Sequence, residues 1–268
     1  MASQSPGLAL FDRRPRLRRP GLFVTGTDTG VGKTLVACAL AAALRQQQPG
    51  WHVGVCKPFA SGCRRDREGL VHEDAEALAH FADCRLPLQT IAPIRFKAPL
   101  APAVAAELLK QDIDRAALRQ SFEQLDQHCD AIIVEGVGGV MVPLDQHRPQ
   151  LTVLDLAATL NYPVLVVARS VLGTLNHTAM TVRLLRESGC TVTGIVMNGY
   201  DADDMGADPS IATNQRWLKK MTGVPVLAVV PRVKPESAQP QRARLDDAVL
   251  EAIALVDWPT RLARPMRH

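Results

Sequence analysis

The sequence predicts an α/β fold in which a mostly parallel, doubly wound sheet carries helices on both faces. Short β-branched and apolar runs alternate along the chain with segments in which apolar residues recur every three or four positions. The strand-like runs are apolar throughout, which is typical of parallel strands that are buried on both faces. A chain of 268 residues with 47% hydrophobic content can form one sizeable core without disulfides or a structural metal.

Strands are expected at residues 22–25, 52–56, 131–135, 164–168, 193–197 and 226–230. Helical periodicity predicts helices at residues 35–47, 74–83, 101–110, 114–128, 153–160, 176–188, 210–222 and 244–256. In a doubly wound sheet, ligands bind beyond the carboxyl ends of the strands. We therefore expect the residues that directly follow the strands to form the functional site.

We expect one α/β domain over residues 21–256, with a basic tail at residues 1–20 and a C-terminal tail at residues 257–268. The formal net charge is +4, but the basic tail contains five arginines against Asp12. The remaining chain has 26 basic and 26 acidic residues, so its charge does not predict a nucleic-acid partner. Because like charges and prolines oppose packing, the basic tail is predicted to be disordered. Anion binding and organelle targeting are the less favoured interpretations.

No apolar run is long enough to span a bilayer, and the arginines precede a predicted strand rather than the apolar segment of an export signal. We therefore expect a cytoplasmic protein without a membrane partner. The six cysteines form no C-x-x-C pair and are interpreted as reduced. Cys56 and Cys63 flank a candidate functional loop, so either is expected to be accessible to modification.

Residues 26–34 read Gly-Thr-Asp-Thr-Gly-Val-Gly-Lys-Thr and join a predicted strand to a predicted helix. Glycines at positions 30 and 32 let the backbone turn sharply, so that several N–H groups converge on an anion at the positive end of the helix. Lys33 would neutralise β- and γ-phosphates, and the Thr34 hydroxyl would bind Mg²⁺. Thr27 replaces the first glycine of the usual G-x-x-x-x-G-K-[ST] spacing. Because both flanks fit, a chance glycine turn is the weaker interpretation, and we expect a nucleoside triphosphate.

Other strand ends carry candidate site residues, each with a structural alternative. Glu135 ends an apolar strand before several glycines, so its carboxylate is expected to face the phosphates and to hold Mg²⁺. A helix cap is the less favoured alternative, because no helical pattern starts there. Lys57 precedes a proline, which favours an extended backbone and an ammonium leaving the strand end; a solvated surface lysine is the alternative. Asp74 lies at a predicted helix start, where capping competes with a metal role. Asn198 is interpreted either as a turn residue or as an amide that contacts a purine.

Residues 26–34, 57–62, 135–139 and 172–177, together with Asn198, resemble the dethiobiotin synthetase family in order and spacing. The resemblance covers residues 21–232, and the pairing of the phosphate loop with Lys-Pro-x-x-Ser-Gly is more specific than either motif alone. It implies a P-loop NTPase fold and a cyclo-ligase of biotin biosynthesis that requires ATP as co-substrate and Mg²⁺ as cofactor. Such an enzyme converts 7,8-diaminopelargonic acid and CO₂ to dethiobiotin, with release of ADP and phosphate. A homodimer is implied as well.

The resemblance also implies roles for individual residues at matching positions. Lys33, Lys57 and Thr29 would act in catalysis, and Thr34, Asp74 and Glu135 would surround Mg²⁺. The substrate would contact Ser61, Gly173, Thr174, Leu175 and Asn176, the last four reaching the substrate carboxylate from a neighbouring subunit. ATP would contact Asp28, Thr29, Gly30, Val31, Gly32, Lys33, Thr34, Asp74, Glu135, Gly138, Asn198 and Pro231, with Asn198 at the adenine.

Two departures from the family pattern limit these assignments. Ala101-Pro102-Ala103 stands where members often have Ser-Pro-His, and Gly30 stands where some have an acidic residue. An amidotransferase-type ATPase with a similar loop would need a glutaminase domain, for which this chain is too short. The main alternative is a partitioning-type or scaffold ATPase switch, which would usually place a lysine early in the loop, whereas residues 26–31 contain none. A catalytically inactive nucleotide-binding module is the third interpretation.

Overall fold

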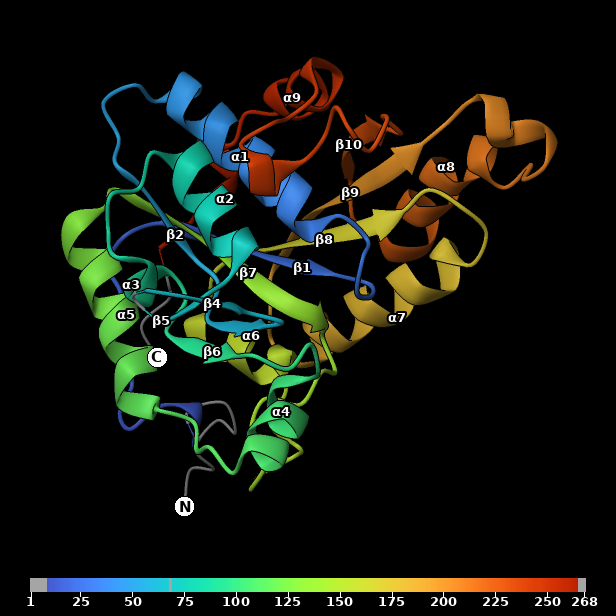
Figure 1. The fold of residues 1–268 in the computed structure, drawn as a ribbon. Helices are drawn as coiled ribbons and strands as arrows, with labels where there is room; N and C mark the ends of the chain where they lie inside the picture. Colours follow the sequence, from blue (N-terminus) through green and yellow to red (C-terminus); the bar gives the residue numbers. More distant parts are fainter. Residues whose placement is uncertain (1–8, 68, 265–268) are drawn as a thin grey trace.

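The computed structural model describes residues 9–67 and 69–264 and is built around one six-stranded sheet (Figure 1). The strand order is β10-β9-β8-β1-β7-β2, and all neighbouring strands are parallel. The strands are β1 (Gly21–Gly26), β2 (Val53–Cys56), β7 (Ala131–Gly139), β8 (Val164–Arg169), β9 (Val192–Tyr200) and β10 (Val226–Pro231). Each lies at a predicted position, so the predicted fold class is confirmed.

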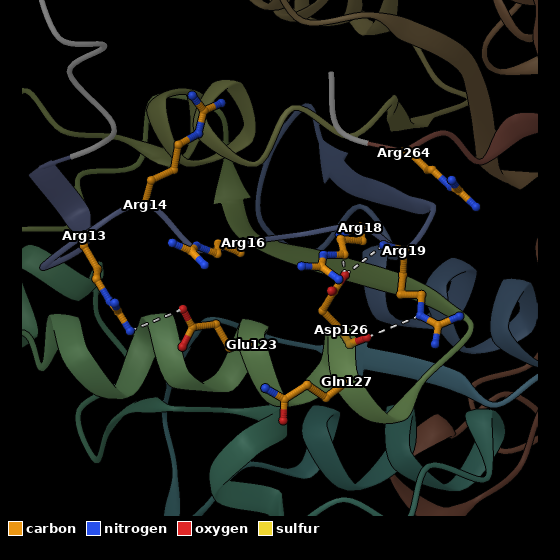
Figure 2. Close-up of a pocket in the computed structure, with 9 residues that line it drawn as sticks. All are labelled: Arg13, Arg14, Arg16, Arg18, Arg19, Glu123, Asp126, Gln127 and Arg264. Atoms are coloured by element: carbon orange, nitrogen blue, oxygen red, sulfur yellow. Dashed lines mark hydrogen bonds and ion pairs between the residues drawn. The ribbon is translucent and has the colours of Figure 1, made fainter. Parts of the chain in front are cut away.

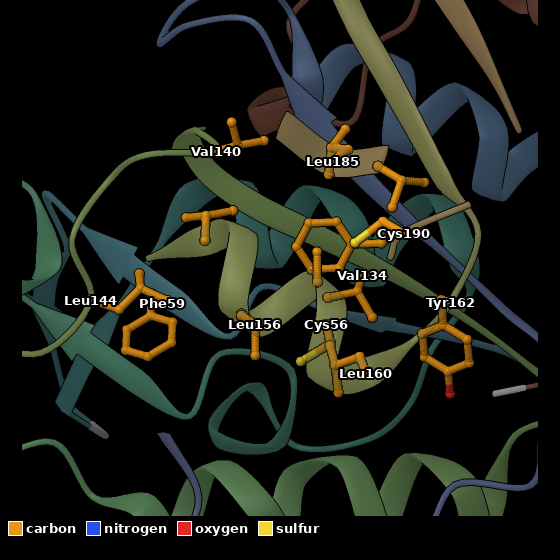
Figure 3. Close-up of a cluster of buried hydrophobic side chains, with 14 of the residues drawn as sticks. Cys56, Phe59, Val134, Val140, Leu144, Leu156, Leu160, Tyr162, Leu185 and Cys190 are labelled. Carbon is orange, nitrogen blue, oxygen red and sulfur yellow. The ribbon is translucent and has the colours of Figure 1, made fainter. Parts of the chain in front are cut away.

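Side chains of the sheet are divided between two hydrophobic cores on its opposite faces. In β1, Phe23 belongs to one core, whereas Leu22 and Val24 belong to the other. The strands β7 and β8 follow the same alternation, because successive side chains of a strand point to opposite faces. Figure 3 shows part of the first core, including Val134 and Tyr162. Burial on both faces explains why the strands are apolar throughout.

Helices cover both faces of the sheet, as predicted. One core receives residues from α1 (Lys33–Gln47), α2 (Glu73–Ala82) and α9 (Asp247–Ala254). The other receives residues from α4 (Pro102–Leu109), α5 (Arg115–His128), α6 (Val153–Leu160), α7 (Thr174–Glu187) and α8 (Ile211–Thr222).

Several short elements were not expected from the sequence. They are α3 (Leu88–Ile91), the parallel pair β3 (Phe59–Ser61) and β6 (Ile94–Phe96), and the antiparallel pair β4 (Arg64–Asp66) and β5 (Gly69–Val71). Within the described residues, 3₁₀ helices occur at Asp203–Gly206, Pro240–Arg242 and Pro259–Arg261. Elements of three or four residues are too short to show a hydrophobic period, which explains why they were missed.

Residues 9–20 pack against the domain, so the prediction of a disordered tail is wrong for this segment. Leu10 and Phe11 are buried in the core that contains α5. The carboxylate of Asp126 on α5 accepts a hydrogen bond from the backbone N–H of Arg18 at 2.6 Å. Apolar burial and this long-range hydrogen bond offset the like-charge repulsion on which the prediction was based.

The C-terminal segment packs through residue 264, beyond the expected domain end at residue 256. Trp258 is fully buried, and its indole N–H donates to the Ile253 carbonyl at 2.8 Å. Residues 1–8 and 265–268, the outer parts of the predicted tails, lie outside the described residues. In the part of the chain that is described, no helix has both the length and the apolar character needed to cross a membrane.

Candidate active site

The phosphate loop connects β1 to α1 at the carboxyl edge of the sheet. Gly30 and Gly32 have φ angles of +70° and +94°, a left-handed conformation that favours glycine. A Cβ atom at Gly32 would also collide with the side chain of Asn198 from β9. The amide of Asn198 donates to the carbonyl of Val31 at 3.0 Å. The loop is therefore fixed by both its glycines and a neighbouring strand.

The two residues that begin α1 present a cation and a hydroxyl to the site. Lys33 is largely buried, and its Nζ donates to the Asp28 carbonyl at 2.7 Å. Burial lowers the pKa of Lys33, although Glu135 acts in the opposite direction. Thr34 Oγ1 donates to Glu135 Oε1 at 2.8 Å. The helix start is thus connected directly to the acidic residue of β7.

Lys57 lies between two carboxylates immediately after β2. Its Nζ donates to Glu135 Oε1 at 2.9 Å and also to Asp74 Oδ2. Burial opposes the charge of Lys57, but Glu135 and Asp74 outweigh burial and raise its pKa. Burial likewise opposes the charge of Asp74, but Lys57 outweighs it and lowers the pKa of Asp74 to about 2. The alternative of a solvated surface lysine is therefore wrong, and Asp74 contributes to the site from the first turn of α2.

The residues around Glu135 fit a hydrated Mg²⁺ ion. Glu135 is 1% exposed, and its Oε2 atom has no hydrogen-bond partner among the described residues. Such an oxygen is costly to bury alone, and a hard cation is a suitable partner for it. Within the described ranges, no group of three or more His, Cys, Asp or Glu residues could hold a metal by itself. Mg²⁺ usually keeps several waters and is bound through one or two carboxylates together with phosphate oxygens.

A cavity of about 420 Å³ brings most of the predicted site together. The predicted residues that line it are Thr29, Gly30, Gly32, Lys33, Thr34, Lys57, Ser61, Asp74, Glu135 and Gly138. They come from the phosphate loop and from segments that follow β2, begin α2 and end β7. Sequence-distant positions therefore meet at one rim, as expected for a doubly wound sheet.

The other predicted residues lie outside the lining of this cavity. Asp28 and Val31 contribute carbonyl groups that hold Lys33 and Asn198, as described above. Pro231 ends β10. The four positions 173–176 form the start of α7, where Asn176 is exposed and Thr174 is buried. Thr174 Oγ1 lies 3.3 Å from Thr178 Oγ1, within its own helix.

The sequence did not predict two residues that surround Asp74. His72 caps α2: its Nδ1 accepts from the Asp74 N–H at 3.1 Å, and its Nε2 lies 2.9 Å from the Ser61 carbonyl. Burial lowers the pKa of His72, and the nearby Lys57 acts in the same direction. Gln241 donates to Asp74 Oδ1 at 3.0 Å. Neither residue follows a strand of the main sheet, so the rule that selected the other positions could not select these two.

A glycine loop, two lysines and two carboxylates at the carboxyl edge of a parallel sheet define a phosphate-loop nucleotide-binding protein. Residues 20–240 match a family model described as an AAA domain. The MinC:MinD cell division protein complex of Aquifex aeolicus gives a TM-score of 0.53 at 13% identity, covering 92% of this chain and 98% of that chain. A ParA family ATPase from Chlorobium tepidum TLS gives a TM-score of 0.51 at 17% identity, covering 90% of this chain and 99% of that chain. Such low identities show the shared fold alone.

Curated relatives define the family more closely. The chain is 43% identical over 232 residues to the ATP-dependent dethiobiotin synthetase BioD of Anaeromyxobacter sp. (strain K), covering 87% of this chain and 97% of the relative. It is 37% identical over 213 residues to the enzyme of the same name from Bacillus subtilis (strain 168), covering 80% and 87%. The chain belongs to the ATP-dependent dethiobiotin synthetase family.

Proposed function

We propose that this chain carries out the ATP- and Mg²⁺-dependent conversion of 7,8-diaminopelargonic acid and CO₂ to dethiobiotin, ADP and phosphate. The observation that carries the proposal is the contact of Lys57 with Glu135 beside the phosphate loop. This contact places the ammonium of Lys57 in the same site as that of Lys33. The reaction of a carbamate with the γ-phosphate brings two anions together, so it needs such positive charge.

The chemistry requires positioning rather than a covalent enzyme intermediate. One substrate amine takes up CO₂ as a carbamate, and a carbamate oxygen attacks the γ-phosphate with release of ADP. The second amine then attacks the resulting mixed anhydride, closing the ring and releasing phosphate. Lys33 would bind the phosphates, while Thr29 and Ser61 at the same cavity would hold the diamine and the carbamate. Holding the reacting groups together can contribute several kcal/mol, roughly 7 at the lower end of measured effects.

Thr34, Asp74 and Glu135 are the residues that would hold Mg²⁺. When bound, the ion would neutralise charge on the β- and γ-phosphates. Lys57 shares two of these carboxylates, so it is positioned to exchange them for the carbamate or the γ-phosphate. Its contacts with Glu135 and Asp74 raise its pKa and keep the ammonium protonated before that exchange.

We infer a homodimer in which residues 173–176 of one subunit bind the substrate carboxylate at the other. This inference rests on the family resemblance and on the position of the segment outside the cavity of its own chain. Asn176 is exposed at the first turn of α7, where backbone N–H groups and the helix dipole favour an anion.

The proposal is tested by phosphate release from Mg-ATP and bicarbonate, with and without 7,8-diaminopelargonic acid, followed by mass detection of dethiobiotin. We expect phosphate release that depends on the diamine and matches the product in amount. The same assay with CTP in place of ATP measures nucleotide preference. Diamine-independent hydrolysis, or none, would contradict the proposal and favour a partitioning-type ATPase switch.

A further inference from the structure

A second cavity, of about 840 Å³, is bordered mainly by arginines (Figure 2). Its lining comprises Arg13, Arg14, Arg16, Arg18, Arg19, Glu123, Asp126, Gln127 and Arg264. The charged groups of this lining are therefore six guanidinium groups and two carboxylates. The segment that carries five of them leads directly into β1, whereas the phosphate loop follows the opposite end of that strand. The arginine pocket is therefore separate from the candidate active site.

The fold itself assembles the arginine pocket. Asp126 Oδ1 accepts the backbone N–H groups of Arg18 and Arg19 at 2.6 and 2.8 Å. The guanidinium of Arg19 donates to the Asp126 carbonyl at 3.3 Å and forms an ion pair of 3.3 Å with Asp130. These contacts hold the segment along α5, as the dashed lines in Figure 2 show in part. The positions of the neighbouring arginines follow from this anchored backbone.

An antiparallel bridge brings the sixth arginine from the other end of the chain. The N–H of Gly21 donates to the carbonyl of Ala263 at 3.0 Å. Arg264 therefore lies beside the segment that precedes β1, and it borders the same cavity. Convergence of two chain segments that are remote in sequence distinguishes this pocket from a solvated run of charges.

Most of the positive charge in the pocket is not neutralised by the protein. Among the described residues, the guanidinium groups of Arg14, Arg16, Arg18 and Arg264 have no carboxylate within 4.0 Å. The guanidinium of Arg13 reaches Glu123 only at 3.9 Å, where it remains 67% exposed. Guanidinium groups provide planar forks that bind phosphate oxygens in pairs. The pocket therefore offers several such forks to an anion.

The shared reaction of the family does not account for the arginine pocket. The family model covers residues 20–240, so all six arginines lie outside the matched region. The cavity has the size of a small-molecule site, which is typically about 300–1,000 Å³. A single inorganic phosphate would occupy little of that space, and a hollow of this size that is bordered by six arginines suits a compact ligand with several phosphate groups better than a duplex or a membrane surface.

We propose that the arginine pocket binds a small molecule with several phosphate groups, at a site independent of the ATP site. The probe is inorganic tripolyphosphate, titrated calorimetrically without added magnesium. The wild-type chain is expected to bind two equivalents, one at the phosphate loop and one at the arginine pocket. Arg14→Gln/Arg16→Gln/Arg18→Gln is expected to lose one of these, with at least tenfold weaker binding at that site, whereas Lys33→Ala is expected to weaken the other.

Two matched variants separate specific recognition from general charge. Arg85→Gln/Arg148→Gln/Arg216→Gln removes the same charge from exposed positions outside the pocket, and it is expected to bind two equivalents. Arg14→Lys/Arg16→Lys/Arg18→Lys keeps the charge but removes the forks, and it is expected to bind with intermediate affinity. If the Gln variant of the arginine pocket and the Gln variant of residues 85, 148 and 216 lose tripolyphosphate binding equally, the proposal is overturned.

Two further measurements test larger anions as occupants of the arginine pocket. Binding of the same variants to phosphatidylglycerol vesicles is measured by sedimentation, and binding to a 20-bp DNA duplex is measured by titration. If the wild-type chain binds one equivalent of tripolyphosphate, and Lys33→Ala weakens that binding while the arginine-pocket Gln variant keeps it, the small-ligand proposal is overturned. If vesicle or duplex binding is then lost in the arginine-pocket Gln variant, the surface is assigned to a membrane or a nucleic acid instead. Activity measured in parallel is expected to be unchanged in that variant, because its substituted residues lie outside the active-site cavity.

Discussion

The side-chain amide of Asn198 donates to the backbone carbonyl of Val31 at 3.0 Å and thereby links β9 to the phosphate loop. The same side chain occupies the space that a Cβ atom at Gly32 would need. One amide thus supports the loop conformation and explains the requirement for glycine there. The adenine contact implied by the family resemblance remains a prediction, and it competes with this supporting role.

Replacing Asn198 with Ala distinguishes these roles. Loss of one hydrogen bond of about 0.5–1.5 kcal/mol predicts roughly two- to tenfold weaker binding of ATP. If Asn198 acts by supporting the loop, the substitution should also weaken the binding of inorganic pyrophosphate to the phosphate loop by a similar factor. Binding at the phosphate loop is measured alone when calorimetry is carried out on Asn198→Ala combined with Arg14→Gln/Arg16→Gln/Arg18→Gln, which removes the arginine-pocket site. Unchanged pyrophosphate binding together with weakened ATP binding would support the adenine role instead.

Lys33→Ala and Lys57→Ala are each expected to reduce diamine-dependent turnover by about a hundredfold or more, because each preorganised charge contact contributes roughly 3 kcal/mol to catalysis. Single-turnover phosphate release with the purified variants measures the effect. Near-normal turnover in either variant would remove that lysine from the chemistry.

The same two variants should differ in stability. Lys57→Ala leaves Glu135 and Asp74 without their shared ammonium, and breaking such a buried pair costs about 3–5 kcal/mol. Burial lowers the pKa of Lys33, so its charge is disfavoured in the folded state and its removal is expected to cost much less. Urea unfolding measures both. Added Mg²⁺ should recover part of the loss in Lys57→Ala, since a cation returns to the carboxylates; no recovery would argue against a metal site there.

The lowered pKa of Asp74 predicts that the free energy of unfolding depends on pH in the acid range. Its folded-state pKa is lowered to about 2, whereas an unfolded aspartate titrates near pH ~3.9. The interaction therefore stabilises the fold above pH ~4 and is lost as the pH falls toward 2. The difference in unfolding free energy between wild type and Asp74→Asn should shrink over that window. A constant difference for Asp74→Asn over that window would contradict the assigned pKa.

The packing of residues 9–20 predicts that loss of this segment destabilises the fold. Leu10→Ala/Phe11→Ala retains every arginine but removes two buried side chains, and full burial of such a side chain contributes about 1.5–3 kcal/mol. We expect several kcal/mol of destabilisation in urea unfolding, against little change for Leu255→Ala, whose side chain is largely exposed. Trimming of residues 1–19 should produce a comparable loss of stability. A trimmed chain as stable as the wild type would restore the prediction of an unpacked tail.

Cys84 is expected to be the first thiol to react. It is half-buried, whereas the other five cysteines, including Cys56 and Cys63, are buried, so the expected accessibility of those two is wrong. A hydrogen bond from Cys129 lowers the pKa of Cys84 and favours its thiolate at neutral pH. Iodoacetamide labelling with mass detection at pH 7 should mark this position first. Early labelling that persists in Cys84→Ser would contradict this assignment.

Local sequence predicted the main strands and the phosphate loop because hydrophobic period and glycine spacing are properties of neighbouring residues. It placed Lys33 in the site because the residue lies in the glycine loop between a strand and a helix, and it placed Glu135 there because the apolar run of the predicted strand ends at that residue. It could not place Gln241 on Asp74, since that contact joins positions 167 residues apart. For the same reason, charge pattern alone missed the carboxylate of Asp126 that holds the segment before β1.

The six residues of β1 join the two anion-binding regions, and a strand of that length spans about 20 Å. A compact phosphate ligand cannot touch both ends, so the two ligands would occupy one molecule without competing for space. Their charges are separated by more than the screening distance of about 8 Å in physiological salt. Any influence of one ligand on the other would therefore travel mainly as a small displacement of β1 between its neighbours β7 and β8.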